Sequence, residues 1–331
     1  MKNTYGNKFK IRVYGGSHTK SIRITFSGLP SDFNIDSDNL YSYIKRRQPG
    51  SRGTTTRIEQ DIPHIKKNKN SISIVFYNKN INDNVYSNFN DTPRPSHADY
   101  TQLNKYGDNY NMFGGGMASG RMTLLIVTAG AIAEQLFKFY GLTLDIVASI
   151  TEMHGNSNKS QFEDEINTAI NKKTSIGAVI ECVVKNPPKF IGEPFFDSVE
   201  SEISKLAFSI PGIKGIEFGD GFECTRKYGH ERNDVYINNL GETLSNNEGG
   251  INGGISNGND IIFRVAIKPT ASIFRTQSTY NFKTNKIEDL KIKGRHDVCF
   301  ALRTPVIIES IAAIALIDLY MQHYEKIWSN R

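Results

Sequence analysis

Short runs in which hydrophobic and polar positions alternate recur along the chain, and this period-two pattern is typical of half-buried β-strands. Lys10–Tyr14, Ile22–Phe26 and Ser71–Tyr77 have this pattern. Strands are also expected at Leu142–Ile150, Ile176–Val184, Gly215–Phe218 and Asp260–Lys268. The stretch 66–79, which contains the third of these runs, is rich in lysine. We expect it to form a solvated hairpin or loop.

Four other segments have the wider spacing of helices. They are Asp36–Arg47, a segment from Ser119 to about Tyr140, Phe196–Phe208, and a last segment that begins near Pro305. In the first, Leu40, Tyr43 and Ile44 share one face, and Asp36 or Ser37 is suited to the N-cap. Strands and helices alternate without a clean linker or a short repeat, so we expect one α+β domain over residues 1–331.

Composition indicates a packed protein with a basic surface or pocket. The 331 residues are 38% hydrophobic and 22% charged, which is ordinary for a globular chain. The net charge is +6 and the isoelectric point is about 9.0. Such a balance fits nucleic acid, or equally a small and highly anionic substrate held by arginines. The placement of the arginines decides between these two interpretations.

The cysteines and the chain's apolar runs bear on its compartment. Cys182, Cys224 and Cys299 are widely spaced and odd in number, so they predict neither a disulfide framework nor a metal site. The N-terminal stretch lacks the apolar core of a signal peptide. No run approaches the length of a membrane span. We expect a cytoplasmic protein with no bound metal and no membrane partner.

Two motifs in the first 61 residues carry side chains suited to chemistry. In "YGGSHT" (Tyr14–Thr19) a glycine turn brings His18 to the end of a strand, although a turn histidine without a role has the same pattern. In "RRQPGSRGTTTRIEQD" (Arg46–Asp61) four arginines surround a Pro-Gly turn. Guanidinium groups suit carboxylate and phosphate oxygens because they donate paired hydrogen bonds. A nucleic acid would be bound equally well by the charge, but no recognition helix or exposed aromatic row accompanies it.

Three further motifs lie downstream. "RPSHADYT" places His97 after a proline turn, and a triple glycine then leads to Ser119 at a helix start, where an anion is favoured. "GGINGGISNG" is followed by a strand that ends in the segment 268–272, whose cation and hydroxyls suit a phosphate or a flavin carbonyl. "GRHDVCFALRTPVIIES" places Asp297 before a buried helix, and burial makes an aspartate a candidate base. Each of these is also compatible with a plain turn or a strand end.

In this order, the motifs resemble those of the chorismate synthase family. That family has approximately GESHG, RRxPG, RPGHADYT followed by Gly-Gly-Gly, GGIxGGISxG leading to KPTxSI, and GRHDPCxxxRxxPxxE. This chain has GGSHT, RRQPG, RPSHADYT, FGGGMASGRMT, GGINGGISNG with KPTASI, and GRHDVCFALRTPVIIE. The match spans almost the whole chain.

The resemblance implies a β-α-β sandwich subunit, assembled as a homotetramer, that binds reduced FMN. It implies an anti-1,4-elimination of phosphate and the C6 proton from 5-enolpyruvylshikimate 3-phosphate, giving chorismate without net redox change. NADPH is a candidate reductant. The substrate carries two carboxylates and a phosphate, which gives the arginines a purpose. No nucleic acid or membrane is expected as a partner.

The resemblance also assigns roles to positions. His18 would protonate the reduced flavin, His97 would assist departure of the phosphate, and Asp297 would help to take the C6 proton through the flavin N5. Arg47, Arg52 and Arg121 would bind anionic groups of the substrate or an NADPH phosphate. The positions implied for FMN are Met117, Ala118, Ser119, Pro211, Gly212, Gly253, Lys268, Pro269, Thr270, Ala271, Ser272 and Arg295.

The chain departs from the family pattern at several positions. These are Gly16, Thr19, Phe113, Met117 and Val298, and a segment of the form SGxxxGxTxGxPI is replaced by Ile62–Tyr77. Because His18, His97 and Asp297 are present, we favour an active enzyme. Two alternatives remain: a degenerate homologue that binds flavin or substrate without turnover, and a basic RNA-binding protein.

Overall fold

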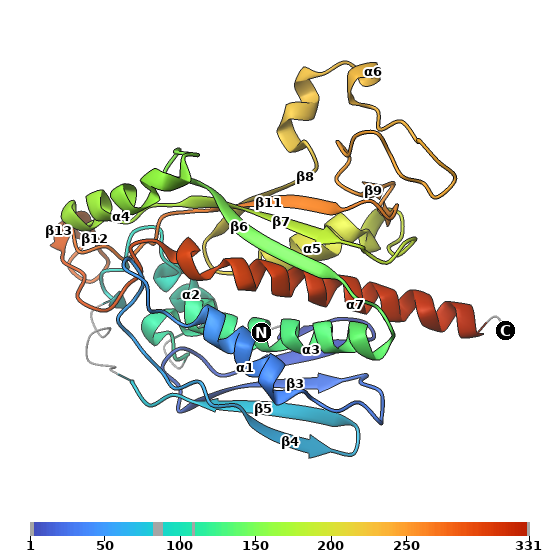
Figure 1. Cartoon of the computed structure of the whole chain (residues 1–331). Coiled ribbons are helices and arrows are strands. Elements are labelled where there is room, and N and C mark those ends of the chain that lie inside the picture. Colours follow the sequence, from blue (N-terminus) through green and yellow to red (C-terminus); the bar gives the residue numbers. More distant parts are fainter. Residues whose placement is uncertain (1–2, 82–88, 108–109, 330–331) are drawn as a thin grey trace.

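Two antiparallel β-sheets enclose a layer of helices in the computed structural model, which describes residues 3–81, 89–107 and 110–329 (Figure 1). The first sheet has the order β1 (Thr4–Tyr5), β2 (Lys10–Tyr14), β3 (Ser21–Ser27), β5 (Ser71–Tyr77) and β4 (His64–Asn68). The second has the order β6 (Asp145–Met153), β7 (Ala178–Lys185), β11 (Ile261–Ile267) and β8 (Ile213–Phe218). The expected α+β fold with a β-α-β sandwich is confirmed.

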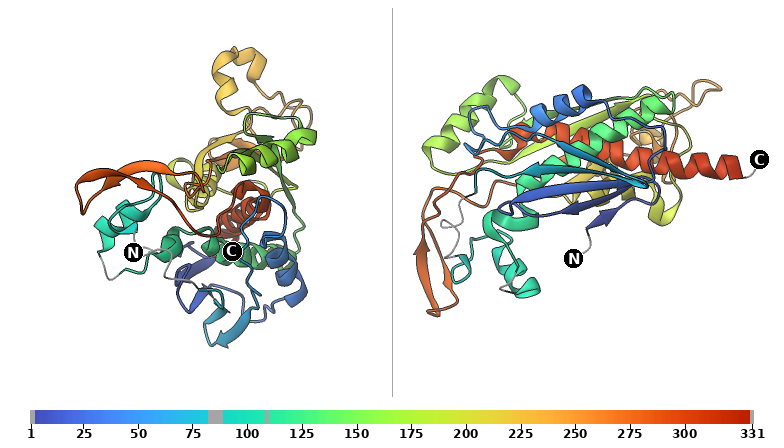
Figure 2. Two further views of the ribbon diagram at one scale, coloured as in Figure 1. Left: turned by 90° about the vertical axis from the view of Figure 1, so that its left-hand side faces the viewer. Right: turned by 90° about the horizontal axis from the view of Figure 1, so that it is seen from below.

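The remaining elements are helices and two small hairpins. The helices are α1 (Ser37–Arg47), α2 (Asp99–Tyr106), α3 (Thr123–Phe139), α4 (Phe162–Asn171), α5 (Val199–Ala207), α6 (Gly229–Arg232) and α7 (Pro305–Ser329). The hairpins join β9 (Ile251–Asn252) to β10 (Ile255–Ser256) and β12 (Gln277–Asn281) to β13 (Lys286–Leu290). Figure 2 shows the second hairpin beside α2 at the edge of the molecule, where Tyr100 stacks on Phe282 with ring centroids 5.0 Å apart.

The central layer is formed mainly by α3 and α7, which begin at the same end of the molecule (Figure 1). Nearly all side chains from Thr123 to Phe137 in α3 and from Val306 to Leu319 in α7 are buried, as the hydrophobic effect requires of helices covered by sheets on both sides. The two helices approach closely at Gly130, where a Cβ atom would lie 2.3 Å from Cβ of Ser310. The chain segments that lead into α3 and α7 are therefore held next to each other, and both carry motif residues.

The expected strands and helices are found within a few residues of their predicted bounds. Asp36 caps α1 by accepting hydrogen bonds from the amides of Asp38 and Asn39, and Leu40, Tyr43 and Ile44 are buried as predicted. The helix predicted from Ser119 is divided. Ser119 caps one turn at Gly120–Met122, and α3 begins at Thr123. The hairpin predicted in stretch 66–79 is confirmed by β4 and β5.

Several short elements were not predicted, among them α2, α4 and the β12–β13 hairpin. All five residues of β4 are exposed, and α2 and α4 each bury only two residues. The small buried face of α2 leaves little hydrophobic period in the sequence. The apolar residues of α4 do recur at helical spacing, at Phe162, Ile166, Ala169 and Ile170, and this signal was missed. The exposed strand β4 is held in place by its backbone hydrogen bonds to β5.

Two segments are, by length and composition, capable of crossing a membrane: Gly120–Phe139 and Pro305–Tyr324. The expectation that no apolar run reaches that length was therefore wrong. The most apolar windows of these segments are 78% and 83% buried inside the protein. Their apolar character serves the core between the two sheets, which is the ordinary reason for a helix that is hydrophobic on all sides.

Candidate active site

A cavity of about 430 Å³ lies where the segments leading into α3 and α7 meet the ends of strands β3 and β11. All five motifs except the glycine-rich part of the fourth contribute to its wall. The predicted site residues in the wall are His18, Arg47, His97, Ala118, Ser119, Arg121, Pro211, Gly212, Lys268, Pro269, Thr270, Ala271, Ser272, Arg295 and Asp297. Residues almost 280 positions apart in the sequence thus share one wall.

Three predicted site residues lie outside this wall. Arg52 is exposed on the turn after α1. Gly253 is at the tip of the β9–β10 hairpin. Met117 lines a separate hollow beside Tyr14, where its amide donates a hydrogen bond to the hydroxyl of Tyr110 at 3.3 Å. These three residues do not line the cavity of the single chain. Their assignment to the flavin or the substrate stays a prediction.

The triple glycine provides space for both histidines. Gly114 has a φ of +61°, and a Cβ atom there would lie 2.6 Å from Cδ2 of His18. Gly115 has a φ of +92°, and its Cβ atom would lie 3.5 Å from Cε1 of His97. The amide of Ser17 donates to the carbonyl of Gly116 at 3.1 Å, which joins the two motif turns. Glycine is therefore needed both for the positive φ angles and for the close approach of the first imidazole.

His97 forms a chain of contacts with Asp99 and Arg94. Its Nδ1 lies 2.7 Å from Oδ1 of Asp99, and Arg94 donates to both oxygens of that carboxylate, from Nε and Nη2, at 2.7 Å each. Burial alone would raise the pKa of Asp99, but the hydrogen bonds from Arg94 and the contact with His97 hold that pKa well below its usual range. Asp99 is thus a permanent carboxylate that orients the imidazole.

The protonation of His97 is set by two opposing effects. Burial lowers its pKa below the ordinary value, and the neighbouring charges of Arg94 and Lys268 act in the same direction. Asp99 opposes them. His97 is therefore mainly a neutral imidazole at neutral pH. An anionic ligand beside it would favour the protonated form, in which it can donate a proton to a leaving group.

We predict that Asp99→Asn moves the pH profile of kcat toward lower pH. The carboxylate is what raises the pKa of His97 against burial, so its removal lowers that pKa further, by about one unit or more. If the reaction uses protonated His97, the fall of kcat with rising pH therefore begins at a lower pH in the variant than in the wild-type enzyme. The profile of kcat from pH 5 to 9 checks this. An unchanged profile in a folded variant would show that Asp99 does not control His97.

Three arginines and two aspartates form the opposite part of the wall. Asp61 pairs with Arg47 and Arg121, at 3.0 Å and 2.5 Å, and Asp297 pairs with Arg303 at 2.7 Å. All five residues are buried. Burial lowers the pKa of Arg47 to about 9, with Asp61 opposing and the other two arginines reinforcing this effect. The guanidinium remains charged at neutral pH, and the cluster holds one positive charge more than it holds negative charges.

Asp297 is buried, as expected, but it is not isolated. Arg303 donates to both of its oxygens, from Nε at 3.1 Å and from Nη2 at 2.7 Å. The amide of Thr55 donates to Oδ1 at 2.9 Å. These contacts fix the position of the carboxylate in the cavity wall.

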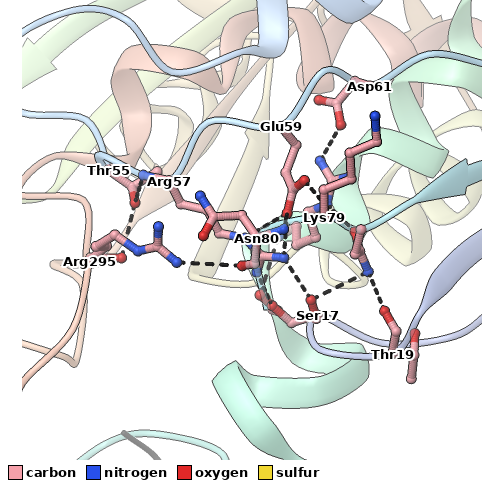
Figure 3. Close-up of polar contacts among 12 residues, drawn as sticks. Ser17, Thr19, Thr55, Arg57, Glu59, Asp61, Lys79, Asn80 and Arg295 are labelled. Atoms are coloured by element: carbon pink, nitrogen blue, oxygen red, sulfur yellow. Dashed lines mark hydrogen bonds and ion pairs between the residues drawn. The ribbon is translucent and has the colours of Figure 1, made fainter. Parts of the chain in front are cut away.

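Another acidic residue of the wall, Glu59, connects three segments through hydrogen bonds (Figure 3). Its carboxylate accepts from Arg57 at 2.9 Å and from the amides of Lys79 and Asn80 at 3.0 Å and 3.2 Å. Arg57 also donates to the hydroxyl and the carbonyl of Ser17 at 3.0 Å each. The turn that carries His18 is thereby fixed to the segment after α1.

The segment 268–272 has the polar atoms that a bound ligand would use. Lys268 donates from Nζ to the carbonyl of Ser96 at 2.7 Å, and Ser272 accepts from Arg94 at 3.0 Å. In this part of the wall, Oγ1 of Thr270 and Nε2 of His296 are buried and have no hydrogen-bond partner among the described residues. Burial, helped by the charge of Arg94, lowers the pKa of His296 to about 4, so this imidazole is neutral. Unpaired buried polar atoms in a cavity wall fit a polar ligand such as a flavin.

Sequence reasoning missed Asp61, Arg94, Asp99 and Arg303 as site residues. Arg94 and Asp99 lie within or beside the motif of His97, and Arg303 lies within the motif of Asp297. Each of these charged residues lies within a motif that was recognised from other residues. That position in a motif was the sequence feature that could have identified them as site residues. Within the ranges that the structure describes, no group of three or more histidine, cysteine, aspartate or glutamate residues could hold a metal ion.

The geometry of the cavity shows that it suits an anionic ligand but does not name the protein family. Comparison with known proteins does. The family model described as chorismate synthase matches residues 9–321. The chain belongs to the chorismate synthase family. The chorismate synthase of Chitinophaga pinensis is 41% identical over 99% of this chain and 100% of that protein. Those of Christiangramia forsetii and Methanobrevibacter smithii are 36% and 35% identical, each over 96% or more of both chains.

A solved structure agrees on the fold. A crystal structure of a chorismate synthase has a TM-score of 0.73 with this chain, at 21% identity, covering 96% of this chain and 93% of the other. The family resemblance inferred from the motifs is confirmed, and with it the activity of a chorismate synthase, a carbon–oxygen lyase of aromatic biosynthesis. The enzyme acts on a small molecule, which accounts for an arginine-lined cavity.

Proposed function

We propose that the cavity is where this chorismate synthase eliminates phosphate and the C6 proton from 5-enolpyruvylshikimate 3-phosphate with the help of reduced FMN. The observation that supports this most is the meeting of two histidines, a buried aspartate and a cluster of three arginines around one cavity. A substrate with two carboxylates and a phosphate matches the positive charge of these arginines.

The surroundings of each residue in the cavity wall suit it to a particular role in binding or proton transfer. Arg47 and Arg121 would bind anionic groups of the substrate. His97, oriented by Asp99, would donate a proton to the departing phosphate, and Asp297, positioned by Arg303 and the amide of Thr55, would receive the C6 proton. His18 would supply a proton to the flavin. Reduced FMN, when bound, supplies transient electron density to the breaking carbon–oxygen bond.

The flavin site would be formed by Ala118, Ser119, Pro211, Gly212, Lys268–Ser272 and Arg295, together with Met117 and Gly253 from outside the cavity wall. The unpaired atoms of Thr270 and His296 support a polar ligand here. Arg52 would add to the anion site, and NADPH is the candidate reductant. We further propose a single domain over residues 1–331, a homotetramer and a cytoplasmic location. One continuous core cluster that includes both sheets supports the first of these.

The direct test is an assay of phosphate and chorismate release from 5-enolpyruvylshikimate 3-phosphate with reduced FMN under anaerobic conditions. Equal amounts of both products, dependent on the flavin, are expected. Release of neither product by the folded protein would instead support the degenerate homologue.

We also predict that FMN binds mainly when the substrate is present. The flavin phosphate and the substrate are both anionic and both lie among residues of one cavity, so ordering the wall with one ligand favours the other. Titration of FMN with and without the substrate, followed by flavin fluorescence, checks this. Tight flavin binding that is wholly indifferent to the substrate would contradict a shared cavity.

A further inference from the structure

Asp61 occupies an unusual position in the cavity wall. It has a φ of +53°, a left-handed conformation that costs energy for a residue with a side chain. Its side chain is almost fully buried. Each of its two oxygens contacts a different arginine, Oδ2 to Arg47 at 3.0 Å and Oδ1 to Arg121 at 2.5 Å. The strained backbone thus places one carboxylate between two guanidinium groups that come from different helical segments.

The same two arginines keep unused donors. Nε and Nη1 of Arg47 and Nη2 of Arg121 are buried and have no hydrogen-bond partner among the described residues. Arg121 is further fixed through Nε, which donates to Oδ1 of Asn78 at 3.0 Å. A buried guanidinium donor without a partner is costly, so such atoms mark where a ligand completes the structure.

Charge explains why a ligand of one type fits. Asp61 offsets one of the two positive charges of Arg47 and Arg121, and the other remains. A single carboxylate or one phosphate oxygen pair would satisfy the free donors of both guanidinium groups and the remaining charge. Without Asp61 the two arginines would repel each other and lose their common anchor.

We propose that Asp61 is a positioning residue of this enzyme, which holds Arg47 and Arg121 so that their free donors bind one anionic group of the substrate. The inference rests on the proposed use of this cavity for the substrate. Asp61 itself does not touch the substrate. It acts through the geometry of the two arginines, so its loss should weaken binding more than it slows the chemical step.

Asp61→Asn tests this cleanly because asparagine tolerates a positive φ better than most residues. The amide keeps one acceptor but turns a donor toward one of the arginines. We expect the KM for 5-enolpyruvylshikimate 3-phosphate to rise about tenfold or more, with kcat lowered less than threefold. Asp61→Gly, which also suits the positive φ, should raise the KM similarly and serves if Asp61→Asn does not fold.

Two controls separate positioning from stability. Asp318→Asn removes another buried aspartate, one that accepts the amides of Asn7, Lys8 and Phe9 far from the cavity. It should lower the melting temperature and leave the KM unchanged. In an Arg121→Lys background, Asp61→Asn should add little further loss, because the partner through which it acts is already altered.

Competitive inhibition shows whether the two arginines bind the phosphate or a carboxylate of the substrate. The two probes are inorganic phosphate and shikimate, whose only anionic group is a carboxylate. A weaker inhibition constant in Asp61→Asn for either probe supports the proposal and names the group. A KM that falls, because the pocket has become more positive, would overturn it, as would a KM equal to that of the wild type in a folded variant. Absence of turnover by the wild-type enzyme would count against the proposed function instead.

Discussion

Replacing His97 by alanine is expected to lower kcat by roughly a hundredfold or more, with the melting temperature little changed. The imidazole is oriented by Asp99 at 2.7 Å and lies in the cavity wall, so its removal deletes a proton donor without opening the core. Steady-state kinetics with reduced FMN, together with thermal unfolding, check this.

His64→Ala is the matched control. His64 is exposed on β4, and its ring contacts only the ring of Tyr77 among the aromatic contacts of the described residues. Its replacement should leave kcat and KM as they are. Near-normal turnover of His97→Ala would mean that this histidine is a turn residue.

Arg47→Lys is expected to raise the KM for the substrate about tenfold or more. Arg47 uses Nη2 to bind Asp61 and keeps Nε and Nη1 for a ligand. A lysine ammonium has one nitrogen and cannot satisfy both in the same geometry, although its charge is the same. The KM at fixed ionic strength checks the prediction.

The same variant separates the enzyme from an RNA-binding protein. A surface that binds RNA through counterion release scarcely responds to a swap that conserves charge. Arg23→Lys, on the exposed side of β3, is the control and should change neither property. Unchanged substrate kinetics in Arg47→Lys, together with tight and steeply salt-dependent RNA binding, would contradict the proposed role of the cavity.

Local pattern was sufficient for most of the architecture. The hydrophobic period of the segments that become β3, β5 and α1 is strong, because each buries one face against the core. Elements that were missed, such as α2 and the β12–β13 hairpin, bury little. Periodicity could not reveal them, since it reports burial rather than hydrogen bonding.

The sequence by itself determined the family, the fold class and the residue types of the site, because turns that need glycine and proline fix short motifs around His18, His97 and Asp297. Only the tertiary structure decided how these residues are paired. Asp61 meets Arg121 across 60 positions, and Thr55 meets Asp297 across 242. Such contacts depend on how α3 and α7 pack between the two sheets. No local pattern encodes that packing, and the protonation of each group follows from it.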